Sequence, residues 1–356
     1  YAVDPEPAIA AIGLRRLLEI DPMLAEPVVK QAVASPDSQV RQLAAEILVG
    51  QATPESVALL GTMLDDPHPG VRTYAQASMV ELAARAPLDR PVRQAAMKML
   101  MTERPRGLEQ AALVLGALDH EPAADRLLEL LEFPEPKVTI TAAWALCRLA
   151  VPATAEPILA MIRRETKVIG ALAKEIDRKF AEHPQGMIPI PALEDRYERL
   201  NHLIQALGRV RHAAADSFLR GFLPKPRMRG PTEPPDLAAT SQAPLRAAAV
   251  WTLGHLHAGK PDAKLATVLR QRLGDLDENN PESEAVRCMS AVTLARMGDR
   301  DSVPTLREFH DPRTVGSPLH NACGWALHQF AGGGPWKPTG RTREANPVGW
   351  FLEPID

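Results

Sequence analysis

The stretch DPHPGVRTYAQASMVEL, residues 66–82, determines the fold that the sequence predicts. It opens with an acidic residue and two prolines, and the aliphatic residue Val71 follows. From Val71 onward, small and apolar residues recur at Tyr74, Ala75, Met79 and Leu82. This spacing of three and four residues places them on one face of an α-helix. The stretch therefore predicts a helix that begins after a proline-marked turn and buries one face.

The same pattern recurs along the chain, which indicates a repeat protein. Other clear copies include PEPKVTITAAWALCRL, APLRAAAVWTLGHL and SPLHNACGWALHQF. We call the first aliphatic residue of each copy its anchor and count offsets from it. Clear copies have their anchors at Val40, Val71, Val138, Leu245, Val286 and Leu319, and weaker copies at Gly107, Val168 and Arg199. The steps between successive anchors are 31, 36, 31, 30, 31, 46, 41 and 33 residues, too regular for chance.

Each copy predicts a pair of helices. Small or apolar residues fall at offsets 0, 3, 4, 7, 8 and 11, and alanine at offset 4 favours a close helix crossing. Between the alanine-rich runs we expect shorter helices, in ESVALLGTMLDD (55–66), AADRLLELLEF (123–133), AEPILAMIRRE (155–165) and DSVPTLREFHD (301–311). One such pair cannot bury both of its apolar faces, so pairs must stack into an α-solenoid.

Local signals mark the turns of this stack. We expect Asp37, and Asp66 with Pro67, to cap the helices that follow them. Arginine stands one residue after four anchors, and we expect these side chains to form a ladder of ion pairs with acidic residues of neighbouring turns: Arg41, Arg72, Arg246 and Arg287.

The pattern D-P-x-x-x-V-R followed by A-A-x-x-L-G, present as DDPHPGVR (65–72) and AAAVWTLG (247–254), resembles that of HEAT-repeat proteins. The likeness is greatest to the bacterial HEAT-like type found in phycobilin lyases, and it covers roughly residues 5–331. It implies an all-α, armadillo-like, right-handed superhelix of about nine to ten helical hairpins. The alanine-rich run of each copy resembles the helix of the hairpin that lines the concave surface in HEAT proteins. HEAT arrays include scaffolds, transport receptors, phosphatase subunits and a few enzymes, so the resemblance implies a fold rather than one function.

Two segments depart from the repeat. One lies within the predicted solenoid of residues 1–331, and the other follows it. Residues 223–244, LPKPRMRGPTEPPDLAATSQAP, are proline-rich and predict a surface insertion. From Gly332 the helical pattern ends, and GGG at 332–334 predicts a helix stop. We expect residues 332–356 to form an extended tail that caps the last helix or docks a partner.

Composition narrows the classes of function. A net charge of −3 with a pI near 6.4 argues against nucleic-acid binding, and the absence of a long apolar run argues against a membrane span. The three cysteines are far apart in sequence and predict buried, reduced thiols: Cys147, Cys288 and Cys323. The chain begins at Tyr1, so the compartment stays open between the cytoplasm and, after removal of a signal peptide, the periplasm or exterior.

No residue is assigned a catalytic, cofactor-binding or metal-binding role. Deoxyhypusine hydroxylases of the HEAT class use repeated His-Glu pairs, whereas His120-Glu121 is the single His-Glu dipeptide of this chain. His255 and His257 point to opposite sides of their helix, and His320 lies two turns from His328, so neither pair suits one ion. The alternative that remains is an enzyme using the concave groove, such as a lyase acting on a prosthetic group, and it rests on the repeat resemblance alone.

Tryptophan occupies the same register position in three copies: Trp144, Trp251 and Trp325 are all at offset 6, where the other copies have Glu46, Ala77, Leu113, Lys174, Gln205 and Val292. Offset 6 lies about 240° around the helix from the anchor, at the flank of the buried face. An indole there either fills the seam between repeats or faces a partner on the concave surface.

The sequence thus predicts a non-catalytic scaffold, adaptor or structural subunit of a larger complex, which binds a protein partner on its concave face. Exposed indoles would bury much area at little entropic cost, and the insertion carries a basic cluster of Arg220, Lys225, Arg227 and Arg229 that suits an acidic partner. The candidate partner contacts are Trp144, Trp251, Trp325, Arg227, Arg229, Trp336, Trp350 and Phe351.

Overall fold

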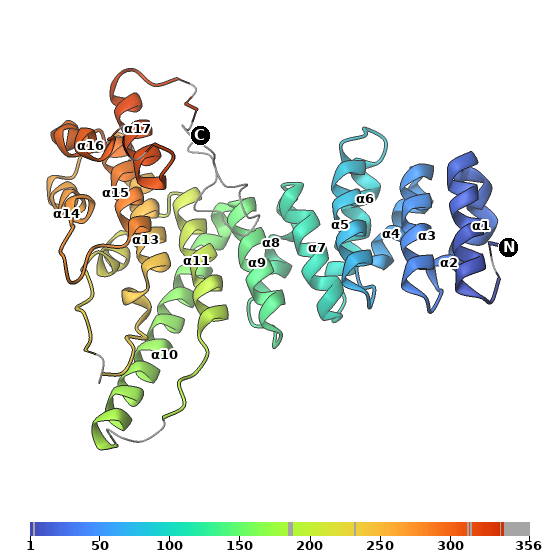
Figure 1. Ribbon diagram of the computed structural model, residues 1–356, viewed down its shortest axis with the longest axis horizontal. Helices are drawn as coiled ribbons and strands as arrows, with labels where there is room; N and C mark the ends of the chain where they lie inside the picture. The colour runs from blue at the N-terminus through green and yellow to red at the C-terminus, as the bar shows by residue number, and fades with distance from the viewer. Residues whose placement is uncertain are drawn as a thin grey trace. The chain divides into compact units, whose positions relative to one another are not determined.

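The fold is all-α, as the sequence predicts. The computed structural model describes residues 1–2, 4–183, 188–230, 233–311, 313, 315–334 and 336–337, and within these ranges it contains α-helices and short 3₁₀ turns but no strand. The chain divides into two compact units, the first formed by Tyr1–Val151 and the second beginning at Pro152. Each unit is a stack of helices in two layers (Figure 1).

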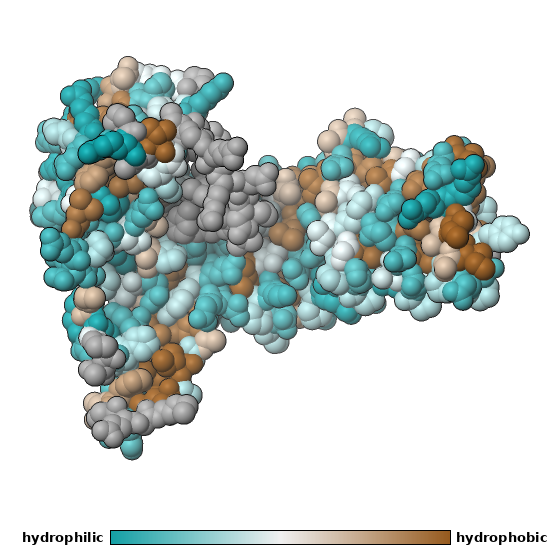
Figure 2. Space-filling view, in the orientation of Figure 1, coloured by the Kyte–Doolittle hydropathy of each residue, from teal (hydrophilic) through white to brown (hydrophobic). Residues whose placement is uncertain are grey.

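In the first unit, the alanine-rich helices form one layer and the shorter helices the other. Consecutive alanine-rich helices contact each other: α1 (Pro7–Ile20), α3 (Ser38–Gln51), α5 (Pro69–Ala83), α7 (Pro105–Ala117) and α9 (Pro136–Leu149). The second layer consists of α2 (Glu26–Val33), α4 (Pro54–Met63), α6 (Asp89–Leu100) and α8 (Ala124–Leu130). Figure 2 shows apolar side chains at the end of this unit formed by α1, where Ile12 is 71% and Ile20 is 63% exposed.

The second unit repeats the arrangement. Its alanine-rich helices are α11 (Glu194–Arg209), α13 (Ala243–Leu256), α15 (Glu284–Met297) and α17 (Pro318–Phe330), each packed against the next. Its other helices are α10 (Ala155–Glu182), α12 (Asp216–Leu219), α14 (Ala263–Gly274) and α16 (Val303–Phe309). In both units the alanines at offset 4 are fully buried, which explains the close approach of consecutive helices: Ala44, Ala75, Ala111, Ala142 and Ala249.

One predicted helix pair is absent. The sequence predicts a short helix over 155–165 and a new copy anchored at Val168, but α10 is one continuous helix of 28 residues. No proline or capping turn interrupts the chain after Pro157, Gly170 alone does not break a helix, and Val168 remains 40% exposed. In the described part of the chain, the first unit contains α1 and four helix pairs, and the second unit contains four helix pairs.

The predicted caps are half right. The Asp37 carboxylate accepts hydrogen bonds from the backbone N–H groups of Gln39 at 2.8 Å and Val40 at 3.0 Å, so it caps α3. Asp66 does not cap α5, which begins at Pro69 after His68. Its carboxylate instead accepts two hydrogen bonds from the buried guanidinium of Arg41, at 2.7 and 2.9 Å. It also accepts a hydrogen bond from the backbone N–H of His68 at 2.8 Å, so it holds the residue before α5 rather than the first turn of the helix.

Two arginines at offset 1, Arg41 and Arg246, bind successive repeats together, and we call this contact the inter-repeat clamp. Arg41 also donates to the carbonyl of Ser35 in the turn of its own repeat, so it joins that turn to Asp66 of the next. Arg246 makes the same connection, with Glu282 at 2.6 and 2.7 Å and the Phe222 carbonyl at 3.2 Å. The prediction of a ladder is confirmed for these two.

The other two arginines of the predicted ladder bind backbone carbonyls. Arg72 donates to the carbonyl of Asp66 at 2.7 Å, and Arg287 donates to that of Leu273 at 2.9 Å. The Arg287 guanidinium also lies 4.5 Å from the centre of the Phe309 ring. All four arginines therefore hold helix-connecting turns, because a guanidinium has enough donors to satisfy several carbonyls at once.

Candidate functional site

The offset-6 tryptophans of α9 and α13 lie in the seams between repeats. A methyl group on Gly116 of α7 would stand only 2.6 Å from Cζ3 of Trp144, and one on Gly208 of α11 only 2.8 Å from Cζ3 of Trp251. Both glycines are nine residues after the anchors of their own copies. Each indole thus rests one edge on a helix backbone that glycine leaves open, while the residue as a whole is half-buried.

Hydrogen bonds between the helices fix this register in the second unit. The Thr252 hydroxyl donates to the carbonyl of Ile204 in α11 at 2.9 Å, and the Thr293 hydroxyl donates to that of Val250 in α13 at 2.8 Å. Both threonines follow offset 6 by one residue and are fully buried. The side chain at offset 6 of each helix is therefore held in a defined position beside the preceding helix.

Trp325 is the most enclosed of the three tryptophans, with 5% of its surface exposed. Between it and Trp251 lies Arg296 of α15, whose guanidinium carbon is 5.9 Å from the Trp325 ring and 5.5 Å from the Trp251 ring. His255 lies against Trp251 on the same helix, with ring centroids 4.0 Å apart. We call Trp251, His255, Arg296 and Trp325 the tryptophan–arginine cluster.

The electrostatics of this cluster are positive. Burial, and then the nearby charges of Arg296, Arg211 and Arg209, lower the pKa of His255 to about 3, so this imidazole is neutral at pH 7. Burial, and then the charge of Arg211, lower the pKa of Arg296 to about 10, so its guanidinium stays charged. Within the described ranges Arg296 has no carboxylate within 4.0 Å, and its buried Nη1 has no hydrogen-bond partner.

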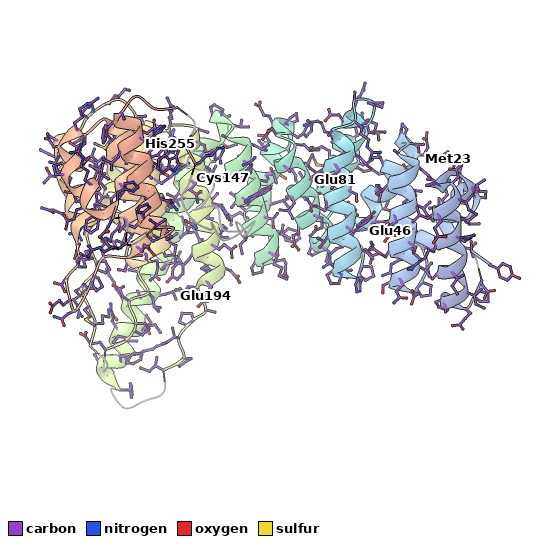
Figure 3. All side chains as sticks on the ribbon, turned by 45° about the horizontal axis from the view of Figure 1, so that its top comes forward. Met23, Glu46, Glu81, Cys147, Glu194 and His255 are labelled. Carbon is purple, nitrogen blue, oxygen red and sulfur yellow. The ribbon has the colours of Figure 1, made fainter. Side chains whose placement is uncertain are left out.

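Sequence reasoning missed Arg296. The available signal was offset 10, one helical turn after offset 6, where successive copies carry Arg209, His255 and Arg296. The first unit has different chemistry at these two offsets, with Glu46 at offset 6 of α3 and Glu81 at offset 10 of α5, both labelled in Figure 3. Burial and these two carboxylates raise the pKa of Tyr74, which lies near them.

The basic residues of the insertion are neutralised by carboxylates. Arg227 binds Glu233 at 2.8 Å and Arg229 binds Asp177 of α10 at 2.6 Å. Lys225 binds Asp275 at 2.7 Å, and Arg220 binds Asp216 and Asp262 at 2.8 and 2.7 Å. These pairs attach the insertion to α10 and to the turn after α14, so the four residues do not form the uncompensated positive patch that the sequence suggested.

Trp336 lies against the last helix. A methyl group on Gly324 of α17 would be 2.8 Å from its Cη2, and its ring centre is 5.5 Å from that of His328. Helix α17 ends at Phe330, and Gly332, Gly333 and Gly334 all have positive φ, which confirms the predicted helix stop. Trp350 and Phe351 lie outside the described residues.

The remaining candidate groups occupy separate places. His257 binds Asp216 at 2.6 Å, whereas His320 contacts the Asp311 carbonyl and His328 the Gly334 carbonyl. Over the described ranges, no three His, Cys, Asp or Glu residues are grouped to hold a metal ion, and no helix is both long and apolar enough to cross a membrane. The three cysteines are buried and form no disulfide with one another, as predicted: Cys147, Cys288 and Cys323.

No protein-family model matches the chain, and no curated protein matches it. Solved structures do. A chain in the structure of Kap95p bound to RanGDP aligns over 93% of this chain and 46% of its own length, with a TM-score of 0.51 and 13% identity. The complex of CpcE and CpcF of phycocyanin lyase from Nostoc sp. PCC7120 aligns over 78% and 94%, with a TM-score of 0.43 and 17% identity. The likeness to the Kap95p structure shows the fold, a HEAT- and armadillo-type α-solenoid, and at 13% identity it shows no activity.

Proposed function

We propose that this chain is a non-catalytic interaction module, an adaptor or a structural subunit of a larger complex, which binds a protein partner on the face of its alanine-rich helices. The observation that carries the proposal is the half-buried state of Trp144 and Trp251. Each indole is fixed in a seam over a glycine and yet keeps part of its surface accessible. A fixed indole loses little conformational entropy on binding and supplies a large apolar contact, as binding hot spots require.

The other candidate contacts have different weights. Trp325 is buried and serves as a wall beside Arg296 rather than as an exposed contact. Arg227 remains exposed although it binds Glu233, so a partner carboxylate would have to compete for it, and Arg229 is committed to Asp177. Trp336, which packs against α17, and Trp350 and Phe351, later in the sequence, remain candidates for a second contact.

The test is co-purification of the full chain from its native source, with identification of the bound protein by mass spectrometry. Trp144→Phe and Trp251→Phe keep an aromatic ring in each seam while reducing the exposed area. We expect each to weaken the association about tenfold, with a small change in melting temperature. Met101→Ala is the matched control, because Met101 is 58% exposed at the end of α6, in the other layer.

Two outcomes would contradict the proposal. Association that is indifferent to both tryptophan substitutions would place the interface elsewhere. A chromophore or metal bound to the purified chain at stoichiometric level, with no protein partner, would favour an enzyme that uses the same face.

A further inference from the structure

Arg296 differs from Arg41 and Arg246, the two buried arginines that bind carboxylates. Arg41 and Arg246, which are less exposed, bind Asp66 and Glu282 through two hydrogen bonds each. Arg296 is half-buried and, in the part of the chain that the structure describes, it has no carboxylate partner. Its Nη1 is buried without any hydrogen bond, although burial of an uncompensated charged donor is costly.

Its surroundings increase this cost. Arg211 is exposed, close enough to lower the pKa of Arg296, and also without an ion pair among the described residues. Arg296 is in the last turn of α15, where the negative end of the helix dipole stabilises one positive charge. The dipole does not explain why Arg211 lies near Arg296, nor why the guanidinium has one indole on each side.

Three consecutive helices build this arrangement. α13 supplies Trp251, α15 supplies Arg296 and α17 supplies Trp325, and the buried Thr293 hydroxyl bonds α15 to α13. The two rings contribute cation–π attraction and displace water from the guanidinium. A guanidinium desolvated in this way forms strong paired hydrogen bonds with a carboxylate, since its planar fork matches the two carboxylate oxygens.

We propose that Arg296, held between Trp251 and Trp325, binds a carboxylate of an acidic segment of the partner protein. The proposal rests on the proposed function and names the chemistry of the partner. An apolar residue next to the carboxylate would pack on the accessible part of Trp251, while Arg211 adds long-range attraction. A carboxylate fits better than a phosphate group, because the enclosed site offers one guanidinium between apolar walls and a phosphate dianion takes more donors. The net charge of −3 also disfavours nucleic acid.

The experiment measures fluorescence anisotropy of short labelled peptides with the full chain. The probe is a peptide in which aspartate and glutamate alternate with leucine and phenylalanine. Its counterparts carry asparagine and glutamine, or phosphoserine, at the acidic positions, and a labelled oligothymidylate tests nucleic acid. We expect the acidic peptide to bind and the amide peptide to bind at least about tenfold more weakly.

Variants of the chain assign the binding to the cluster. We expect Arg296→Gln to weaken the acidic peptide about 10- to 100-fold, and Arg296→Lys to weaken it less, since lysine keeps the charge and loses the fork. Arg300→Gln is the matched control, because Arg300 is exposed and lies 5.8 Å from the Phe330 ring. This variant should bind the peptide as tightly as the unaltered chain does. Because the charge is unpaired, Arg296→Gln and Arg296→Met should not lower the melting temperature.

Several results would overturn the assignment. Equal binding of the acidic and amide peptides, no binding of the acidic peptide at about 1 mM, or unchanged binding by Arg296→Gln would remove the carboxylate site. Preference for the phosphoserine peptide or for oligothymidylate would assign the cluster to phosphate. A lower melting temperature in both Arg296→Gln and Arg296→Met would make the arginine structural. None of these results affects the co-purification test, so the interaction module can stand while this site fails.

Discussion

The seam between Gly116 and Trp144 gives the sharpest test of how consecutive repeats pack. In Gly116→Ala, the new methyl group would lie 2.6 Å from Cζ3 of Trp144 and 3.1 Å from Cα of Ala145. Carbon atoms in contact prefer about 3.5–4.0 Å, so the ring must move by about 1 Å. Alanine gains about 0.5–1 kcal/mol over glycine inside a helix, but overpacking costs about 1–3 kcal/mol. We therefore expect a net loss of about 1–2 kcal/mol in the free energy of unfolding.

Removal of the indole should reverse this effect. Trp144→Ala alone should cost about 1–3 kcal/mol, less than a fully buried tryptophan because the residue is half-buried. In that background the contact with Cζ3 is gone and only the milder 3.1 Å contact with Cα of Ala145 remains, so Gly116→Ala should be neutral or stabilising by up to about 1 kcal/mol. The coupling free energy between the two positions is then about 1–3 kcal/mol.

The assay is urea unfolding of the four members of this cycle, followed by far-UV circular dichroism. Gly170→Ala in α10 is the control, because a methyl group there meets no atom within 4 Å. It should stabilise by about 0.5–1 kcal/mol. If Gly116→Ala stabilises as Gly170→Ala does, and the coupling is below about 0.5 kcal/mol, the indole does not fill the seam.

Three further predictions concern stability and reactivity. Arg246→Met removes both hydrogen bonds of Arg246 to the buried Glu282 carboxylate and leaves Arg272, at 3.6 Å, as its remaining cation; it should cost about 3 kcal/mol in urea unfolding, whereas the double variant with Glu282→Met should recover most of that loss. Burial lowers the pKa of His202 to about 4, and the pKa of His255 is about 3, so the unfolded chain binds more protons than the folded chain below pH 6.5. Unfolding free energy should accordingly fall as pH decreases from 6.5 towards 4, and fall less in His255→Gln; equal slopes in the two chains would contradict this. Burial raises the pKa of the Cys323 thiol to about 12, and we expect slow reaction with a thiol reagent at pH 8 until urea unfolds the chain, for all three of Cys147, Cys288 and Cys323.

The sequence predicted the alanine-rich helices well, because their periodicity is local and each is preceded by a proline or an acidic turn. It failed at α10, where the stop between two helices was inferred from the repeat rather than from a residue that ends a helix. The position of Asp66 was also predicted from local preference alone. Its carboxylate accepts both the bidentate bond of the buried Arg41 guanidinium and the N–H of His68, while α5 begins one residue later, at Pro69.

The candidate site was less accessible to sequence reasoning. The register located Trp144 and Trp251 but not the glycines beneath them, which belong to the preceding copy. The charge state of the insertion depends on partners far away in sequence, such as Asp177, which is 52 residues from Arg229. The isolation of Arg296 likewise became visible only when three helices were assembled.

The inter-repeat clamp limits which duplications and deletions of the sequence leave a stable chain. Arg41 stands at the start of one repeat interval and Asp66 near its end, so residues 40–70 contain both halves of a clamp. Tandem duplication of such an interval, with its breakpoints at anchors, supplies a new donor and a new acceptor together. A deletion between anchors also removes both. Breakpoints elsewhere would leave a buried guanidinium or carboxylate without its partner, so the array can gain or lose whole intervals far more easily than fragments of them.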